Sequence, residues 1–249
     1  PTYPQLNPYI NVIDEKTFET GNKNLDPELT GKVEVSHSYS IKNFRLFSHL
    51  YYSDASDFIV QVSYLIPPDT LVMTYANGDW LRKAGGGVDG TVDVGRWMTV
   101  QTGISLWYSK SAGSFNGVDL SSEGVSWGFS LKASFFPWKQ GEILGTFSYS
   151  SPSYLPEFYL HELHTTDMGV RQSFFDRKLT VSLTLTDLFN SRKWIVETTN
   201  DQFTLFNESK TDSRVLWVGL SWSMQATTQQ KGKKAAPSET EEGLIRVGQ

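Results

Sequence analysis

Long stretches of the chain alternate apolar and polar residues one by one, and this period of two restricts the fold more than any other feature. From 125 to 135 the odd positions hold Val, Trp, Phe, Leu, Ala and Phe, while the even positions hold Ser, Gly, Ser, Lys and Ser. Successive side chains of a β-strand point to opposite faces, so this pattern predicts a strand with one apolar face. The same alternation returns at 33–41, 98–106, 179–186 and 216–224. No segment has a convincing amphipathic helical pattern, and we expect an all-β fold.

The alternating segments predict about nine strands joined in an up-and-down antiparallel meander. They lie at 30–41, 43–64, 70–94, 97–110, 120–136, 140–151, 162–175, 178–189 and 212–224. Tight turns are expected at 41–43, 94–97, 137–141 and 175–178. The intervening connections are mostly longer and richer in Ser, Asn, Asp and aromatic residues: 66–70, 110–124, 150–161 and 190–212. Because the two kinds of connection alternate, the sheet should have two unlike ends.

The length of the strands indicates a membrane. They run to about 10–13 residues or more, whereas strands of soluble proteins are most often about 5–6 residues long. At about 3.3 Å per residue and a tilt near 45°, about 10 residues cross the hydrocarbon layer of an outer membrane. Aromatic residues near the strand ends suit the two interfacial girdles of a transmembrane β-barrel: Tyr39, Phe44, Tyr52, Trp97, Tyr108, Phe135, Tyr149, Phe174 and Trp222. A soluble β-sandwich is the alternative, although it requires shorter strands and a second sheet over every apolar face.

Composition excludes several classes of protein. The 249 residues carry a net charge of −5, whereas nucleic-acid-binding domains are usually basic, so we expect no nucleic-acid partner. Cysteine is absent, which excludes disulfide scaffolds, thiolate nucleophiles and cysteine zinc sites. The mean hydropathy of −0.34 resembles that of a soluble protein. The polar lumen and loops of a barrel give the same value.

Two motifs that suggest chemistry have simpler structural explanations. The glycine-rich stretch 85–90 lacks the Lys-Ser/Thr pair and the following helix of a nucleotide-binding loop. Glycines within a strand more often mark a bend or close packing. His161 and His164 resemble a metal-binding pair, but residues three apart on a strand point to opposite faces, and we interpret them as polar loop residues. We therefore predict no metal site, no cofactor, no catalytic residue and no enzymatic activity.

Four blocks of sequence, taken together, resemble a known family. They are Leu6-Asn7-Pro8-Tyr9 with Gly-Asn-Lys-Asn-Leu-Asp-Pro-Glu at 21–28, Ser-Pro-Ser at 151–153, Phe-Phe-Asp-Arg-Lys-Leu at 174–179 with Thr-Asp-Leu-Phe-Asn at 186–190, and the segment 214–224. In this order they resemble the outer-membrane β-barrel family of TonB-dependent receptors, of the Bacteroidetes type. The motif positions expected to be structural are Gly21, Asn22, Pro27, Glu28, Asp187, Phe189 and Asn190.

Ordinary backbone chemistry accounts for several of these motif positions. Gly21 and Asn22 suit a turn with positive φ, and Pro27 ends any helix before the strand that follows. Asp187 and Asn190 flank the end of a strand, where their side chains can cap local backbone groups.

The resemblance implies a receptor that takes up a scarce ligand, such as a siderophore, glycan or peptide, across the bacterial outer membrane. Such a barrel has about 22 strands and a plugged lumen. Nine strands that end with the family's last strand would be its C-terminal part. Residues 1–27 are then an extracellular loop leading into the barrel, 28–224 are C-terminal barrel strands, and 225–249 are a disordered periplasmic tail.

The same resemblance supplies the expected partners. These are the lipid bilayer, the remaining strands and plug of the same barrel, the TonB complex acting through an N-terminal box absent from these residues, and a surface lipoprotein as a further candidate. The barrel-insertion machinery is another, because the closing strand resembles its C-terminal signal. In that signal Gly219 and Trp222 match, while Met224 stands where the terminal aromatic is usual.

The long connections hold exposed aromatic residues that are candidates for ligand contact. These residues are Tyr154, Phe158, Tyr159, Trp194, Phe203 and Phe206. Aromatic rings beside Asn, Asp and Arg suit a glycan, a peptide or a siderophore complex. Alternatively, the rings stack on one another and cap the barrel mouth. Two other functions stay open: a barrel without TonB coupling that serves protein export or as a surface scaffold, and a soluble β-rich binding module.

Overall fold

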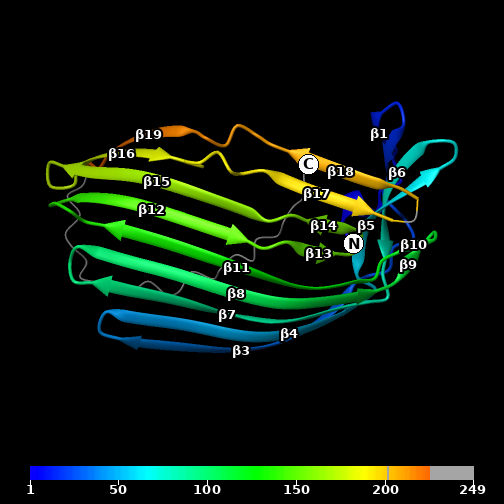
Figure 1. Ribbon diagram of the computed structural model, residues 1–249, viewed down its shortest axis with the longest axis horizontal. Helices are drawn as coiled ribbons and strands as arrows, with labels where there is room; N and C mark the ends of the chain where they lie inside the picture. The colour runs from blue at the N-terminus through cyan, green and yellow to red at the C-terminus, as the bar shows by residue number, and fades with distance from the viewer. Residues whose placement is uncertain (201, 225–249) are drawn as a thin grey trace.

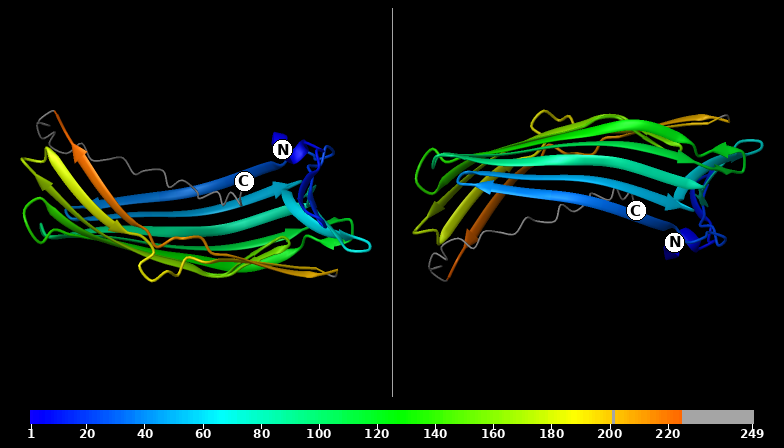
Figure 2. Two further views of the ribbon diagram at one scale, coloured as in Figure 1. Left: turned by 90° about the horizontal axis from the view of Figure 1, so that it is seen from above. Right: turned by 90° about the horizontal axis from the view of Figure 1, so that it is seen from below.

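The computed structural model describes residues 1–200 and 202–224, and its body is one long, curved antiparallel sheet (Figure 1). This nine-stranded sheet has the order β19-β16-β15-β12-β11-β8-β7-β4-β3. Its strands are β3 (Leu29–Ile41), β4 (Phe44–Ser56), β7 (Trp80–Val94), β8 (Met98–Ala112), β11 (Ser122–Phe135), β12 (Gly141–Ser150), β15 (Leu163–Phe174), β16 (Leu179–Leu185) and β19 (Leu216–Trp222). The predicted all-β meander is confirmed, and the sheet is open, with β3 and β19 at its two edges. Figure 2 shows the sheet bent into a trough.

Two of the predicted strands are each divided in the structure. The segment 43–64 comprises β4 and most of β5 (Ile59–Ile66), and 70–94 comprises β6 (Thr70–Asn77) and β7. Between β4 and β5 the backbone of Asp57 adopts a positive φ of 54°. This turns the β5–β6 hairpin out of the large sheet and into a separate one. Apolar residues hold even positions on both sides of this bend, up to Tyr52 and again from Phe58, although the stretch 53–57 between them is mostly polar. The pattern alone therefore predicted a single strand here.

Exposure on the two faces of the large sheet is inverted relative to a soluble protein. On β11, Val125 leaves 56% of its surface exposed, whereas Ser126 leaves 1%. The strand register places Leu50, Gly86 and Leu106 side by side on this apolar face. Small and polar residues predominate on the opposite, polar face, where Tyr51 and Trp107 also lie and where Arg45 and Asp93 are paired at 3.2 Å. An exposed apolar face is stable only when lipid or another apolar surface covers it.

The height of the apolar face matches a bilayer. On β8 the apolar face runs from Met98 to Tyr108. That is 10 residue steps, so at about 3.3 Å per step and a tilt near 40° it is about 25 Å tall, the height of the apolar band of an outer-membrane barrel. Two residues beyond Tyr108 the same face becomes charged, with a Lys110–Glu123 pair at 2.7 Å and an Arg82–Asp54 pair at 3.4 Å. Charged groups in this row mark the end of the hydrocarbon layer.

The long connections fold into hairpins at one end of the sheet (Figure 1). This end is called the outer end below, and its hairpins the outer hairpins. One four-stranded sheet joins β5 and β6 to β1 (Asn11–Asp14) and β2 (Thr17–Glu19), which follow the short helix α1 (Tyr3–Leu6). The other joins β13 (Ser153–Leu155), β14 (Phe158–Leu160), β17 (Trp194–Thr199) and β18 (Thr204–Ser209). A short hairpin of β9 (Ser114–Phe115) and β10 (Val118–Asp119) lies between β8 and β11.

The buried hydrophobic core lies at this outer end and not in the large sheet. Its members are Ala55, Phe58, Val62, Ala76, Val118 and Leu120. They come from the end of β4, from the β5–β6 hairpin and from the segment around β10, so the core fixes these hairpins to one another. Within the described residues, no helix has the length and apolar character needed to cross a membrane.

Two glycine motifs serve close packing. The predicted positive φ at Gly21 and Asn22 is wrong, because neither residue is among those with positive φ. A Cβ on Gly21 would instead collide with the backbone carbonyl of Asn7. In the 85–90 stretch, a Cβ on Gly86 would lie 2.5 Å from Leu50 Cδ2. The stretch is part of β7, in agreement with the interpretation as close packing.

Candidate functional site

A cavity of about 680 Å³ opens at the outer end between three hairpins. Its lining comes from the β9–β10 hairpin and the start of β11, from the β13–β14 hairpin, and from the end of β17. The lining residues are Gly117, Asp119, Ser121, Ser122, Glu123, Tyr154, Leu155, Glu157, Phe158, Tyr159, Glu197, Thr199 and Asn200. Three of the aromatic residues singled out in the sequence therefore meet in one cavity.

The aromatic rings at the cavity form a connected row. Tyr154 and Tyr159 face each other across the β13–β14 hairpin, with ring centroids 4.9 Å apart. His161 lies 4.8 Å from Tyr159 and 6.1 Å from Phe206, both measured between ring centroids. The rings thus contact one another, in tilted and edge-on arrangements, yet Tyr154 is still 46% exposed. The row is therefore both self-supporting and accessible to a ligand.

The other two candidate aromatics lie farther along the same outer sheet. Trp194 begins β17 and Phe203 lies in the turn between β17 and β18. Neither belongs to the described lining of the cavity. The sequence could place these residues on the long connection 190–212, but not on a particular side of it.

The cavity lining is acidic. Its charged members are Asp119, Glu123, Glu157 and Glu197, and no Lys or Arg is among its described residues. Hydrogen bonds from Ser121, including a 2.9 Å bond from its backbone N–H, lower the pKa of Asp119 and keep it ionised. Burial raises the pKa of the Tyr159 phenol, and the neighbouring Tyr154 and the carboxylates of Glu162 and Glu197 raise it further.

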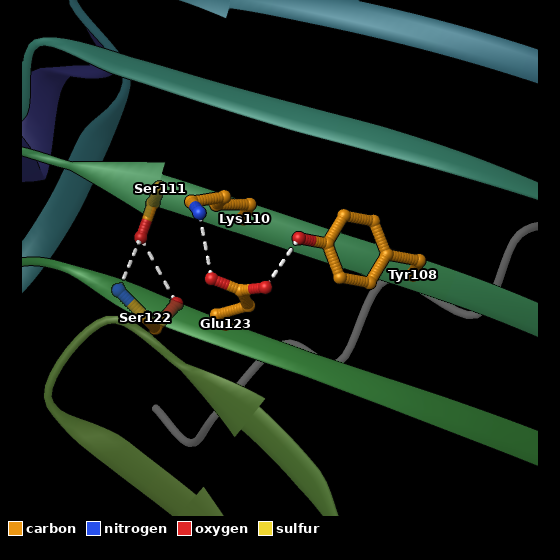
Figure 3. Close-up of polar contacts among 5 residues, drawn as sticks. All are labelled: Tyr108, Lys110, Ser111, Ser122 and Glu123. Atoms are coloured by element: carbon orange, nitrogen blue, oxygen red, sulfur yellow. Dashed lines mark hydrogen bonds and ion pairs between the residues drawn. The ribbon is translucent and has the colours of Figure 1, made fainter.

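One of these carboxylates is already neutralised, as Figure 3 shows. Glu123 pairs with the Lys110 ammonium at 2.7 Å and accepts a 2.7 Å hydrogen bond from the Tyr108 hydroxyl. Beside it, the backbone N–H of Ser122 donates to the Ser111 hydroxyl at 3.0 Å. These bonds tie the cavity wall at β11 to β8.

Glu157 connects the cavity to the other outer sheet. Both of its carboxyl oxygens accept the backbone N–H of Ser63, at 3.2 and 2.9 Å. Asn200 donates from its side-chain amide to the Ser63 carbonyl at 3.2 Å, and Gln202 accepts the N–H of Leu65 at 2.9 Å. Side chains of two turns thus hold the free edge of β5. Burial raises the pKa of Glu157 to about 7.

Asp187 organises the chain where β16 leads into the outer hairpins. Its buried carboxylate accepts the backbone N–H groups of Ser191 and Arg192 at 2.8 and 3.0 Å, and a hydrogen bond from the Ser213 hydroxyl. The structure therefore has the local capping that was predicted for Asp187. Asn190 contributes through its backbone, with φ at 55°, and Phe189 is exposed.

The remaining motif positions also have described contacts. Asn22 donates from its side chain to the Tyr75 carbonyl at 2.9 Å, and Glu28, which follows Pro27, accepts the N–H of Ile59 at 3.1 Å. In β19, Gly219 faces Ser182 of β16. The indole of Trp222 lies 6.3 Å from the Phe175 ring, measured between centroids, and Met224 is exposed.

The two histidines of the suspected metal pair have different surroundings. Nε2 of His161 lies 3.7 Å from a Glu197 oxygen, while His164 stands opposite Tyr149 in the β12–β15 ladder. Over 1–200 and 202–224, no three His, Cys, Asp or Glu side chains form a group that could hold a metal ion.

Solved structures with a similar fold include two bacterial outer-membrane proteins. The siderophore receptor PirA from Pseudomonas aeruginosa aligns with a TM-score of 0.55 and 14% identity, over 77% of this chain and 34% of that one. The FrpB iron transporter from Neisseria meningitidis, F3-3 variant, aligns with a TM-score of 0.56 and 16% identity, over 80% of this chain and 31% of that one. This chain therefore spans about a third of the length of either structure.

At these identities the likeness shows a shared fold. No curated protein sequence matches the chain. A family model does: that of the outer membrane protein beta-barrel family matches residues 1–222. Since this match covers nearly the whole chain, the protein belongs to the outer membrane protein beta-barrel family and resides in the bacterial outer membrane.

Proposed function

We propose that the chain is the C-terminal barrel portion of a TonB-dependent receptor that takes up a scarce ligand across the outer membrane. The observation that carries this proposal is an open sheet of bilayer height that aligns with about a third of a siderophore receptor and of an iron transporter. The four sequence blocks support the same family of receptors, and the Bacteroidetes-type source stays part of the proposal.

The two open edges explain why further strands are required. In hydrocarbon, each backbone N–H or C=O without a partner costs several kcal/mol, so only closed barrels span a membrane as sheets. Among the described residues, no strand pairs with the free side of β3 or of β19. We infer that about 13 further strands of the same barrel close it, to make a total of about 22.

The domain and partner assignments follow from this placement. Residues 1–27 would lie outside the cell and lead into the barrel strands of 28–224. The tail at 225–249, proposed as periplasmic, lies outside the described residues. The polar face would surround a plug that couples to the TonB complex, and a surface lipoprotein would contact the outer hairpins. The insertion machinery would read the closing strand at Gly219, Trp222 and Met224.

The proposed ligand contacts are the six outer aromatics, chief among them the row that includes Tyr154. In cells that depend on the full-length receptor, replacing Tyr154 and Trp194 together with Ala should reduce ligand uptake at least tenfold, because stacked rings supply much of the energy of such contacts. Phe175→Ala is the matched control, since this ring is exposed at the opposite end. Unchanged uptake in the double variant would remove the aromatic contact hypothesis.

The competing function is a barrel of the same build that works without TonB, in export or as a scaffold. Deleting TonB separates the two: uptake by the receptor should be lost, whereas export or surface display should persist. The soluble binding module is set aside, because the family resides in the outer membrane and the apolar face is exposed.

A further inference from the structure

The outer cavity combines accessible aromatic rings with uncompensated negative charge. The rings of Tyr154 and Tyr159 are in contact at an interplanar angle of 48°, and Phe158 lines the same space. A ring face attracts a cation within about 6 Å of its centroid. The rings supply a cation-binding surface of their own, and the surrounding charges strengthen it.

The acidic residues of the lining differ in how far their charges are compensated. Glu123 is paired with Lys110. Asp119 accepts a hydrogen bond from the Ser121 backbone, and Glu197 accepts one from the Thr199 hydroxyl at 3.3 Å while facing His161 at 3.7 Å. Within the described part of the chain, no Lys or Arg forms an ion pair with Asp119 or Glu197. The cavity therefore has a net negative charge beside its rings.

We propose that this cavity binds its ligand through a positively charged group, an ammonium or guanidinium of a peptide or similar solute, held between the rings of Tyr154 and Tyr159 and the carboxylates of Asp119 and Glu197. The inference rests on the proposed function, since it names the ligand class of the same site. An anionic ligand of the same size is disfavoured, because it meets like charge on three hairpins.

Glu157 gives the site a pH dependence. Burial raises the pKa of this lining carboxyl to about 7, so it titrates near neutral pH. The titratable and charged groups around it in the lining are Asp119, Glu123 with its Lys110, Glu197 with His161, Tyr154 and Tyr159. A bound cation favours the ionised carboxylate, so binding releases a proton and strengthens as pH rises from 6 to 8.

The test uses the full-length receptor in detergent and titration calorimetry with three probes. These are tri-lysine, the same peptide acetylated on its side-chain amines, and tri-glutamate. Tri-lysine should bind at least tenfold more tightly than acetylated tri-lysine, and tri-glutamate should bind most weakly. This comparison of peptides uses the unmodified receptor. Absence of tri-lysine binding, or tighter binding of tri-glutamate, would overturn the inference.

Isosteric variants test which residues bind tri-lysine. Together, Asp119→Asn and Glu197→Gln should weaken tri-lysine binding about tenfold, since each partly exposed charge contributes up to about fivefold. Glu15→Gln, an exposed acid in the β1–β2 turn, is the matched control and should change nothing. Glu157→Gln should abolish most of the strengthening between pH 6 and pH 8. An unaltered affinity in the double variant contradicts the site.

The two proposals fail in different ways. If the Tyr154/Trp194 double variant loses uptake while the Asp119/Glu197 variant keeps both uptake and affinity, the transport role stands and the preference for a cation falls. If tri-lysine binding follows the predicted pattern but deletion of TonB leaves uptake intact, the cation site stands and the proposed coupling falls.

Discussion

Two regions of the chain have opposite patterns of burial: the large nine-stranded sheet, called the wall below, and the outer hairpins. In the wall, apolar side chains such as Val125 are exposed and serine side chains such as Ser126 are buried. At the outer end, Val62 and Leu120 are fully buried, as in a soluble domain. The wall is held mainly by its strand ladders, with side-chain pairs such as Ser148–Thr165 across them, and the outer end by a small core and specific hydrogen bonds. Each region therefore matches its own surroundings, lipid at the apolar face of the wall and water at the outer end.

The largest effect is expected from truncating a buried side chain in the hydrophobic core of the outer end. Leu120→Ala should lower the local free energy of unfolding of the outer hairpins by about 2–5 kcal/mol, since it removes a fully buried side chain. Hydrogen exchange of the β5–β6 amides would report it. Leu205→Ala, on the exposed strand β18, is the control and should have little effect. Equal losses of protection in the wall would contradict the separation of the two regions.

A charge on the apolar face tests the lipid side of the comparison. Ile104→Arg lies near the middle of the apolar band and should destabilise the barrel in lipid vesicles by about 2–4 kcal/mol. Val125→Arg, close to the charged row, should cost only about 0–1 kcal/mol. Gln101→Arg on the polar face is the matched control. Urea unfolding of the full-length protein measures all three, and equal effects at both depths would argue against a bilayer around this face.

The junction between the two regions depends on the carboxylate of Asp187. Asp187→Ala leaves the N–H groups of Ser191 and Arg192 without their acceptor in a buried place, and should cost about 1–3 kcal/mol. Limited proteolysis of the 190–212 segment should accelerate, while the wall resists as before. Asp212→Ala, an exposed acid in the same segment, serves as the control. Identical cleavage rates for both variants would show that Asp187 does not anchor the hairpins.

The smallest effect is a pH dependence of the contact between the outer sheets. The folded pKa of Glu157, about 7, is above its ordinary value of 4.5. The folded state therefore holds more protons between these two pH values, and its stability falls as pH rises through that window. The change should stay below about 1 kcal/mol, because the carboxyl is partly exposed. Exchange protection of the Ser63 amide, corrected for intrinsic rates, should decline from pH 5 to pH 8 and stay flat in Glu157→Gln.

The wall could be predicted from sequence because lipid on one side and water on the other impose a choice at every residue. This is why 125–135 shows its two faces directly. The bend at Asp57 was not predicted, because apolar residues resume at even positions after the mostly polar stretch 53–57. For the same reason a two-residue period cannot separate β4 from β5.

The candidate site was only partly predictable. Tyr154, Phe158 and Tyr159 could be assigned to one long connection from composition, and Asp187 could be assigned a capping role from its position at a strand end. The contact between Glu157 and Ser63 joins residues 94 positions apart, and no local pattern connects them. Pairing of this kind depends on the tertiary fold and is visible only in three dimensions.

The side-chain attachment of the β5 edge has a consequence for how such an outer-membrane barrel can evolve. Ser63 and Leu65 are held by acceptors and donors from turns, not by an added strand. A turn can therefore lengthen or change sequence while one Glu, Asn or Gln keeps the attachment, and each doubling of loop length costs only about 0.6 kcal/mol in closure entropy. The outer hairpins, and with them the proposed ligand cavity, can thus change by drift and insertion while the nine strands of the large sheet keep their register.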